Sequence, residues 1–166
     1  MAERRDTVFL VGFMGAGKTT VGRVLANVLG RVFIDLDERI VALEGRPILS
    51  ILEESGERYF RERECALLAA MERRPPTVVA CGGGTYTHEP SRRVIDAVGV
   101  AVWMQLPLEV ALARCGSGAD RPLLRGPEQA RALYRARLPT YRLAPLHVDV
   151  EGLTPEEAAA RISALL

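Results

Sequence analysis

Short apolar runs alternate along the chain with segments in which apolar residues recur every three or four positions. Short β-branched and aliphatic runs predict buried strands, and the recurrence predicts helices. The predicted strands span residues 7–11, 31–35, 77–80, 99–104 and 146–150. The predicted helices span residues 18–29, 37–43, 48–71 (with a break near Ser55 and Gly56), 108–114, 128–142 and a last one that Thr154 caps and Pro155 opens.

This alternation predicts an α/β fold, in which a parallel sheet carries helices on both faces. The strands at 31–35, 77–80 and 99–104 are nearly all apolar, as expected for strands covered on both sides. Ligands of such sheets bind beyond the carboxyl ends of the strands, so the residues that follow each strand are the site candidates. Residues 115–126 lack a helical period and hold three glycines, which predicts a long mobile loop, or lid.

The composition fits one globular domain spanning residues 1–166, with 48% hydrophobic and 26% charged residues. The 22 basic and 21 acidic residues nearly cancel, which gives no reason to expect nucleic acid or a membrane surface as a partner. Three cysteines without a C-x-x-C pair favour reduced thiols and a cytoplasmic location. No apolar stretch approaches the roughly 18 residues of a membrane span.

A phosphate-binding motif follows the first strand. Residues 12–20 read GFMGAGKTT and match G-x-x-x-x-G-K-[ST] between a predicted strand and a predicted helix. Lys18 would reach the β and γ phosphates of ATP, and the Thr19 hydroxyl would ligate Mg²⁺. Lys18 is also the only lysine in the sequence, and a compact ammonium suits this position better than a guanidinium. A glycine-rich turn without a ligand is the alternative. The residues expected to bind the nucleotide here are Gly15, Ala16, Gly17, Lys18, Thr19 and Thr20.

Two carboxylates, Asp35 and Asp37, stand at the end of the second strand. Residues two apart in an extended chain share a side, so both would point above the sheet, near the phosphate loop. One could hold a water on Mg²⁺, and the other could accept a proton from an attacking hydroxyl. The alternative is that Asp37 only caps the following helix.

The third strand leads into the glycine triplet Gly82, Gly83 and Gly84, whose bare backbone N–H groups allow close approach of a ligand. A flexible turn is the alternative. Arg61 lies at the edge of an apolar helix face, where its fork suits a carboxylate. A solvated arginine is the simpler interpretation of that position.

Other charged residues stand out less. Arg121 precedes Pro122 in the long loop and would stabilise a transferring phosphoryl group if the loop closed over ATP. Nothing in the spacing alone distinguishes Arg137 from the other arginines. Glu62 and Glu64 are expected on a solvated helix face.

Taken together, these segments resemble the shikimate kinase family. The resemblance implies the fold of nucleoside monophosphate kinases, a five-stranded parallel sheet in the order 2-3-1-4-5. It also implies a monomer that transfers the γ-phosphoryl group of MgATP to the 3-hydroxyl of shikimate. The segments that carry it, in order, are 12–20, Asp35-Leu-Asp37, Gly56-Glu-Arg-Tyr-Phe-Arg61, Gly82-Gly-Gly84, Arg121-Pro-Leu-Leu124 and Arg137-Leu-Pro-Thr-Tyr141.

The resemblance also implies roles. Asp37 would hold the reacting hydroxyl and act as its base, and Asp35 would serve Mg²⁺ through water. Arg61 and Arg137 would grip the substrate carboxylate. Gly83, with Gly82 and Gly84 beside it, would donate a backbone hydrogen bond to a ring hydroxyl. Arg121 would contact the phosphates, and Arg114 would lie near adenine.

One position departs from the family pattern. Leu52 stands where the family commonly has Phe against the substrate ring, and an aliphatic wall would still exclude water. Two other functions stay open at this point. One is another small-molecule kinase of the same fold, for gluconate or a nucleotide, and the other is a catalytically silent ATP-binding module.

Overall fold

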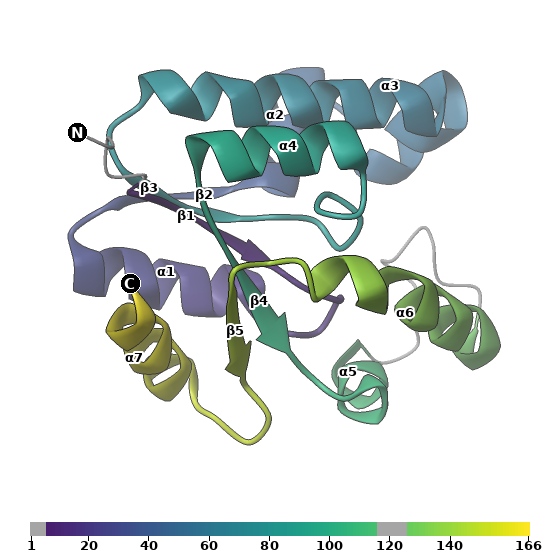
Figure 1. Ribbon diagram of the computed structural model, residues 1–166. Coiled ribbons are helices and arrows are strands. Elements are labelled where there is room, and N and C mark those ends of the chain that lie inside the picture. The colour runs from purple at the N-terminus through teal and green to yellow at the C-terminus, as the bar shows by residue number, and fades with distance from the viewer. Residues whose placement is uncertain (1–5, 116–125) are drawn as a thin grey trace.

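A five-stranded parallel sheet forms the middle layer of the molecule (Figure 1). The computed structural model describes residues 6–115 and 126–166, and its strands lie in the order β2-β3-β1-β4-β5. All four strand pairs are parallel, which confirms the predicted fold class and strand order. The strands are β1 (Thr7–Val11), β2 (Val32–Asp35), β3 (Thr77–Ala80), β4 (Gly99–Gln105) and β5 (Leu146–Asp149).

Helices cover both faces of this sheet, as the sequence predicts (Figure 1). On one face α1 packs against α7, and on the other α3 packs against both α2 and α4. The pair α5 and α6 lies near the carboxyl end of β4. The helices are α1 (Lys18–Leu29), α2 (Leu36–Glu44), α3 (Ile48–Ala70), α4 (Glu89–Val98), α5 (Leu108–Cys115), α6 (Pro127–Tyr141) and α7 (Pro155–Leu165), with a short 3₁₀ turn at Met71–Arg73.

Local signals place several helix ends correctly. Gly56 has a left-handed φ of 84° inside α3, so the long helix is kinked at the predicted break. Thr154 caps α7 in a reciprocal capping box with Glu157. The helix α4 is absent from the sequence prediction, although Pro90 in its first turn is a helix-start signal.

The strand register brings three chain segments together at one edge of the sheet. Leu10 on β1 and Asp35 on β2 both pair with Ala80 on β3, between them. The backbone N–H of Cys81 also donates to the Leu10 carbonyl at 3.0 Å. The residues after β1, β2 and β3 therefore converge at the carboxyl edge, where a ligand site is expected.

None of the helices in the described part of the chain is both long and apolar enough to cross a membrane.

Candidate active site

The loop between β1 and α1 is bent by glycines into a shape that other residues resist. Gly12 has φ 144°, and a Cβ there would lie 2.8 Å from the Met104 carbonyl oxygen. Gly17 adopts the left-handed conformation at φ 87° directly before α1. This geometry ends the strand and starts the helix with its free N–H groups at the loop, which favours anions.

The ammonium of Lys18 folds back over this loop. Its Nζ donates to the Gly12 carbonyl at 2.7 Å and to the Phe13 carbonyl at 3.0 Å. The positive charge therefore lies at the rim of a cavity of about 310 Å³ above the loop. The lining residues are Met14, Gly15, Gly17, Lys18, Thr19, Thr20, Asp35, Asp37, Cys81, Gly82, Gly83 and Arg114.

Thr19 and Asp35 place two hard oxygen atoms next to each other beside the loop. The Thr19 hydroxyl donates to Asp35 Oδ2 at 2.5 Å, while Asp35 Oδ1 accepts from the Glu38 backbone N–H at 3.0 Å. Asp35 is therefore the N-cap of α2, and the alternative that Asp37 is the cap is wrong. Within residues 6–115 and 126–166, no cluster of three or more His, Cys, Asp or Glu side chains could hold a metal. A pair of oxygens without a full cage fits Mg²⁺, which takes few protein ligands and completes its shell with waters and phosphates.

Asp37 lies in the first turn of α2 and is largely buried. Burial raises the pKa of Asp37 to about 6, and the carboxylates of Glu64 and Asp35 add to the rise, against the opposing charges of Lys18 and Arg61. Its Oδ1 atom is buried and has no hydrogen-bond partner among the described residues. A proton acceptor with a pKa near neutrality, placed beside a phosphate loop, is suited to general base chemistry.

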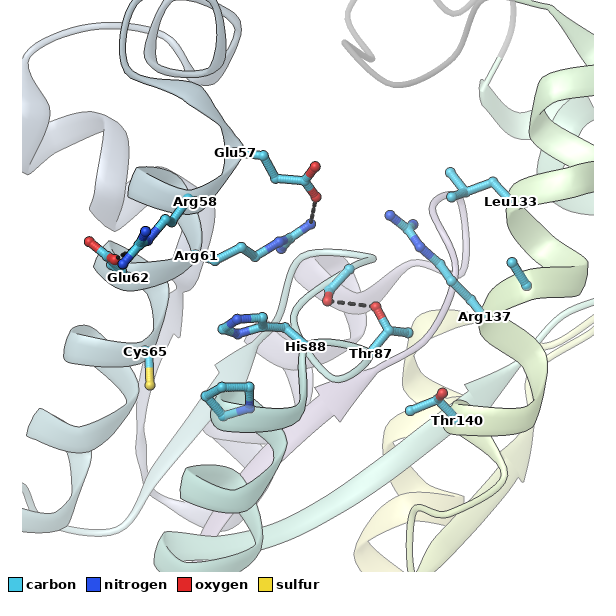
Figure 2. A pocket seen from close by; sticks show the side chains of 13 residues that line it. Glu57, Arg58, Arg61, Glu62, Cys65, Thr87, His88, Leu133, Arg137 and Thr140 are labelled. Carbon is cyan, nitrogen blue, oxygen red and sulfur yellow. Dashed lines mark hydrogen bonds and ion pairs between the residues drawn. The ribbon is translucent and has the colours of Figure 1, made fainter.

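Two guanidinium groups face each other across the glycine triplet (Figure 2). Arg61 comes from α3 and Arg137 from α6, and their side chains point toward one another. A Cβ at Gly83 would lie 2.8 Å from Arg137 Nη1, and a Cβ at Gly84 would collide with Arg61 Nη2. The triplet therefore has a steric reason to be glycine, because each guanidinium packs directly on its backbone.

These arginines line a second cavity, of about 830 Å³, that opens between α3, α6 and the start of α4 (Figure 2). Arg137 is 7% exposed. Burial lowers the pKa of Arg137, and the like charge of Arg61 lowers it further, whereas the side chain of Tyr141 raises it. Two partly desolvated guanidinium groups that face each other favour a bound anion, and their paired N–H groups suit a carboxylate. The residues around this cavity are Glu57, Arg58, Arg61, Glu62, Cys65, Gly84, Thr87, His88, Pro90, Leu133, Ala136, Arg137 and Thr140.

The expectation that Glu64 is solvated is wrong. Its side chain has 0% exposure, and it accepts hydrogen bonds from Arg61 Nη1 and from the Thr85 hydroxyl. Glu62, by contrast, is exposed and pairs with Arg58 as a surface carboxylate should. A buried carboxylate needs such partners, and here they connect the arginine of α3 to the residue that follows the glycine triplet.

The structure places the remaining predicted residues as follows. Arg114 is exposed and its Nη1 donates to the Gly15 carbonyl at 3.1 Å, which brings it to the phosphate loop. Ala16 is buried in the loop itself, at 2% exposure. Arg121 and the lid around it lie outside the described residues. Burial raises the pKa of the Cys81 thiol far above neutrality, which argues against a nucleophile there.

A phosphate loop that opens a helix beside β1, a buried carboxylate next to it and a separate anion pocket define a P-loop kinase for small molecules. The family model described as shikimate kinase matches residues 14–166. The chain therefore belongs to the shikimate kinase family.

Individual relatives agree with this assignment. The chain is 44% identical to the shikimate kinase of Cereibacter sphaeroides over 98% of this chain and 83% of the relative. It is 40% identical to the shikimate kinase of Caulobacter vibrioides over 94% of this chain and 79% of the relative.

Solved structures give the same result at the level of the backbone. The shikimate kinase from Acinetobacter baumannii, solved in complex with shikimate, is 38% identical, with a TM-score of 0.91 over 96% of this chain and 92% of that one. A gluconokinase from Sinorhizobium meliloti, 19% identical with a TM-score of 0.58, covers 98% of this chain and 95% of its own and shares the fold alone.

Proposed function

We propose that this chain transfers the γ-phosphoryl group of ATP to the 3-hydroxyl of shikimate, giving shikimate 3-phosphate and ADP for the synthesis of chorismate and aromatic amino acids. The observation that carries this proposal is the position of Asp37, which lines the cavity above the phosphate loop and is close enough to Lys18 and Arg61 for both charges to act on its pKa. A hydroxyl held by Asp37 can face a phosphate bound to the loop. A carboxylate on the same ring can then reach Arg61 and Arg137.

The phosphate loop supplies the nucleotide side of the reaction. The backbone of Gly15, Ala16 and Gly17 would cradle the phosphates together with Lys18, Thr19 and Thr20. The Lys18 ammonium would then exchange its contacts with the Gly12 and Phe13 carbonyls for phosphate oxygens. Arg114, whose Nη1 donates to the Gly15 carbonyl, would contact the nucleotide near its base.

Thr19 and Asp35 would hold Mg²⁺, the first directly and the second through water. Bound there with ATP, the ion neutralises charge on the phosphates. The Thr19–Asp35 hydrogen bond keeps both oxygens on the same side of the loop. The hydroxyl and carboxylate oxygens are of the type that Mg²⁺ prefers, and their position beside the phosphate loop supports this role.

The acceptor side depends on three groups. Arg61 and Arg137 would bind the carboxylate of shikimate through parallel hydrogen bonds, while backbone N–H groups of Gly82, Gly83 and Gly84 meet its ring hydroxyls. Asp37 would orient the 3-hydroxyl for in-line attack and take its proton at Oδ1. Because the transition state is loose, this positioning and the surrounding positive charge supply most of the catalysis.

Two further parts belong to the proposal. Arg121 would join the phosphates when the lid at 115–126 closes and excludes water. The proposal also includes a monomer, and the need for ATP supports a cytoplasmic location.

A substrate panel tests the proposal. The purified protein is incubated with MgATP and shikimate, gluconate or a nucleoside monophosphate, and the products are identified by ³¹P NMR. We expect a new phosphomonoester signal with shikimate alone. Gluconate is the sharper control because it shares the carboxylate, and turnover of gluconate in preference to shikimate would refute the assignment.

A further inference from the structure

The phenol of Tyr141 reaches the glycine triplet at Gly83, whereas Glu64 contacts Thr85 directly after the triplet. Tyr141 is the last residue of α6, is 1% exposed, and its hydroxyl donates to the Gly83 carbonyl at 2.5 Å. Its ring stacks on Trp103 of β4, with ring centroids 6.0 Å apart and an interplanar angle of 29°. The hydroxyl is therefore held in place by a rigid, buried ring.

Tyr141 also lies one helical turn after Arg137, so the two side chains share a face of α6. Both side chains reach Gly83, since the Tyr141 hydroxyl donates to its carbonyl and Arg137 Nη1 lies 2.8 Å from the position of a Cβ there. The buried hydroxyl is thus bonded to a backbone carbonyl and is close enough to the Arg137 guanidinium to influence its pKa. A phenol has the capacity for both, because its O–H donates while its oxygen accepts.

A hydrogen bond to the Gly83 carbonyl also affects the backbone of the next residue. A peptide unit is planar, so fixing that carbonyl also fixes the direction of the next N–H, which belongs to Gly84. Glycines carry no side chain that could hold their own backbone, and a run of three is conformationally free unless something outside it supplies contacts. Tyr141 supplies one at the centre of the triplet.

We propose that Tyr141 is a positioning residue for the acceptor site. Its hydroxyl would fix the position of the Arg137 guanidinium relative to the backbone N–H groups of the glycine triplet. The inference rests on the proposed function and deepens it, because it concerns the carboxylate end of the same substrate. Tyr141 does not touch the reacting atoms. It acts through Arg137 and Gly83.

The test compares two tyrosines of the same helix. Tyr134 also lies on α6, and its hydroxyl donates to a backbone carbonyl, that of Leu106, at 3.1 Å. Tyr141→Phe and Tyr134→Phe therefore remove the same kind of bond from the same helix, but only the first removes it from the glycine triplet. We expect Tyr141→Phe to raise the KM for shikimate about five- to tenfold, the usual effect of one hydrogen bond, with kcat and the KM for ATP within about twofold of wild type. Tyr134→Phe should leave the KM for shikimate unchanged.

A double-mutant cycle separates positioning from general damage. Arg137→Lys keeps the charge but loses the fork. If Tyr141 acts through that fork, adding Tyr141→Phe to Arg137→Lys raises the KM for shikimate by clearly less than Tyr141→Phe does in the wild type. Full multiplication of the two effects, a wild-type KM in Tyr141→Phe, or equal rises in the KM for ATP and for shikimate would each overturn the inference.

If Tyr141→Phe does not fold, the wild-type protein gives a second test. Trp103 is the only tryptophan in the sequence and stacks on Tyr141, so saturating shikimate should change its fluorescence emission. Unchanged emission contradicts the inference. Failure of the proposed function looks different, because wild-type protein would then release no ADP in response to shikimate at all.

Discussion

Arg61 and Glu64 are three residues apart on α3, and the guanidinium of Arg61 donates to a carboxylate that is wholly buried. The second oxygen of Glu64 accepts from the hydroxyl of Thr85. One carboxylate therefore holds Arg61 at the cavity and connects α3 to the end of the glycine triplet. Its charge also reaches Asp37, whose pKa it helps to raise.

Activity should depend on pH through Asp37. Burial raises the pKa of Asp37 to about 6, with Glu64 and Asp35 as further causes, so the ionised base is lost as the pH falls through that value. We expect an acid limb in the pH profile of kcat/KM near pH 6. Glu64→Gln removes one of the causes and should move that limb to lower pH, while Glu62→Gln, on the exposed side of α3, should not. An acid limb at the same pH in both variants and in the wild type would contradict the assignment.

Replacing Asp37 should separate stability from activity. Asp37→Asn removes the proton acceptor and should lower kcat by about 10²–10⁴-fold. Because folding raises the pKa of Asp37, its ionisation opposes folding at pH 7, so the asparagine variant should gain roughly 1–3 kcal/mol in free energy of unfolding. The wild type regains that stability as the pH falls below about 6, so the gain should shrink toward pH 4. Urea titrations at pH 7 and pH 4 measure the free energy of unfolding of both proteins. Lower stability of the variant at pH 7 would show that the ionised Asp37 carboxylate does not destabilise the fold.

The glycine triplet offers a steric test. A Cβ at Gly84 would collide with Arg61 and lie 3.0 Å from Arg137 Nη2, so Gly84→Ala should displace both guanidinium groups. We expect the KM for shikimate to rise at least about tenfold, since charge-assisted hydrogen bonds are worth roughly 1.5–3 kcal/mol each. The KM for ATP should change little.

Gly30→Ala is the matched control for that substitution. Gly30 ends α1 with φ 64°, and nothing lies within 4 Å of a Cβ there. Alanine should cost about 1–2 kcal/mol of stability from backbone strain and leave the KM for shikimate unchanged. Equal kinetic effects in the two variants would mean that Gly84 contributes only to folding.

The single lysine allows a chemical test of the phosphate loop. A lysine-selective acylating reagent should modify only Lys18 and the amino terminus, because the sequence holds no other lysine. MgATP should protect Lys18 if its ammonium moves from the loop carbonyls to phosphate oxygens. Mass spectrometry of the labelled peptides gives the result, and equal labelling with and without nucleotide would contradict the role of Lys18.

Much of the fold follows from local signals in the sequence. The buried strand β1, the phosphate loop after it and the capping box at Thr154 each depend on residues close together in the chain. The helix α4 was less evident, because its apolar positions Val94, Ile95 and Val98 are few and the segment is otherwise polar. Pro90 and that spacing are the signal that could have found it.

The acceptor site was harder to predict because its contacts span the sequence. Glu62 and Glu64 look alike in the chain, yet only Glu64 is buried, since Thr85 lies against it 21 residues later. Arg137 stands out only through its packing on the glycine triplet. Resemblance to a family named both arginines, but their partners Glu64 and Tyr141 required the structure.

The central claim is that one chain brings a nucleotide and an acidic ring together for phosphoryl transfer. The most direct measurement is the rate of ADP release from MgATP, with and without shikimate, in a coupled assay. We expect shikimate to raise the rate by orders of magnitude over the background hydrolysis of ATP. An ADP release rate that shikimate leaves unchanged would contradict the account, whatever the affinity of the protein for ATP.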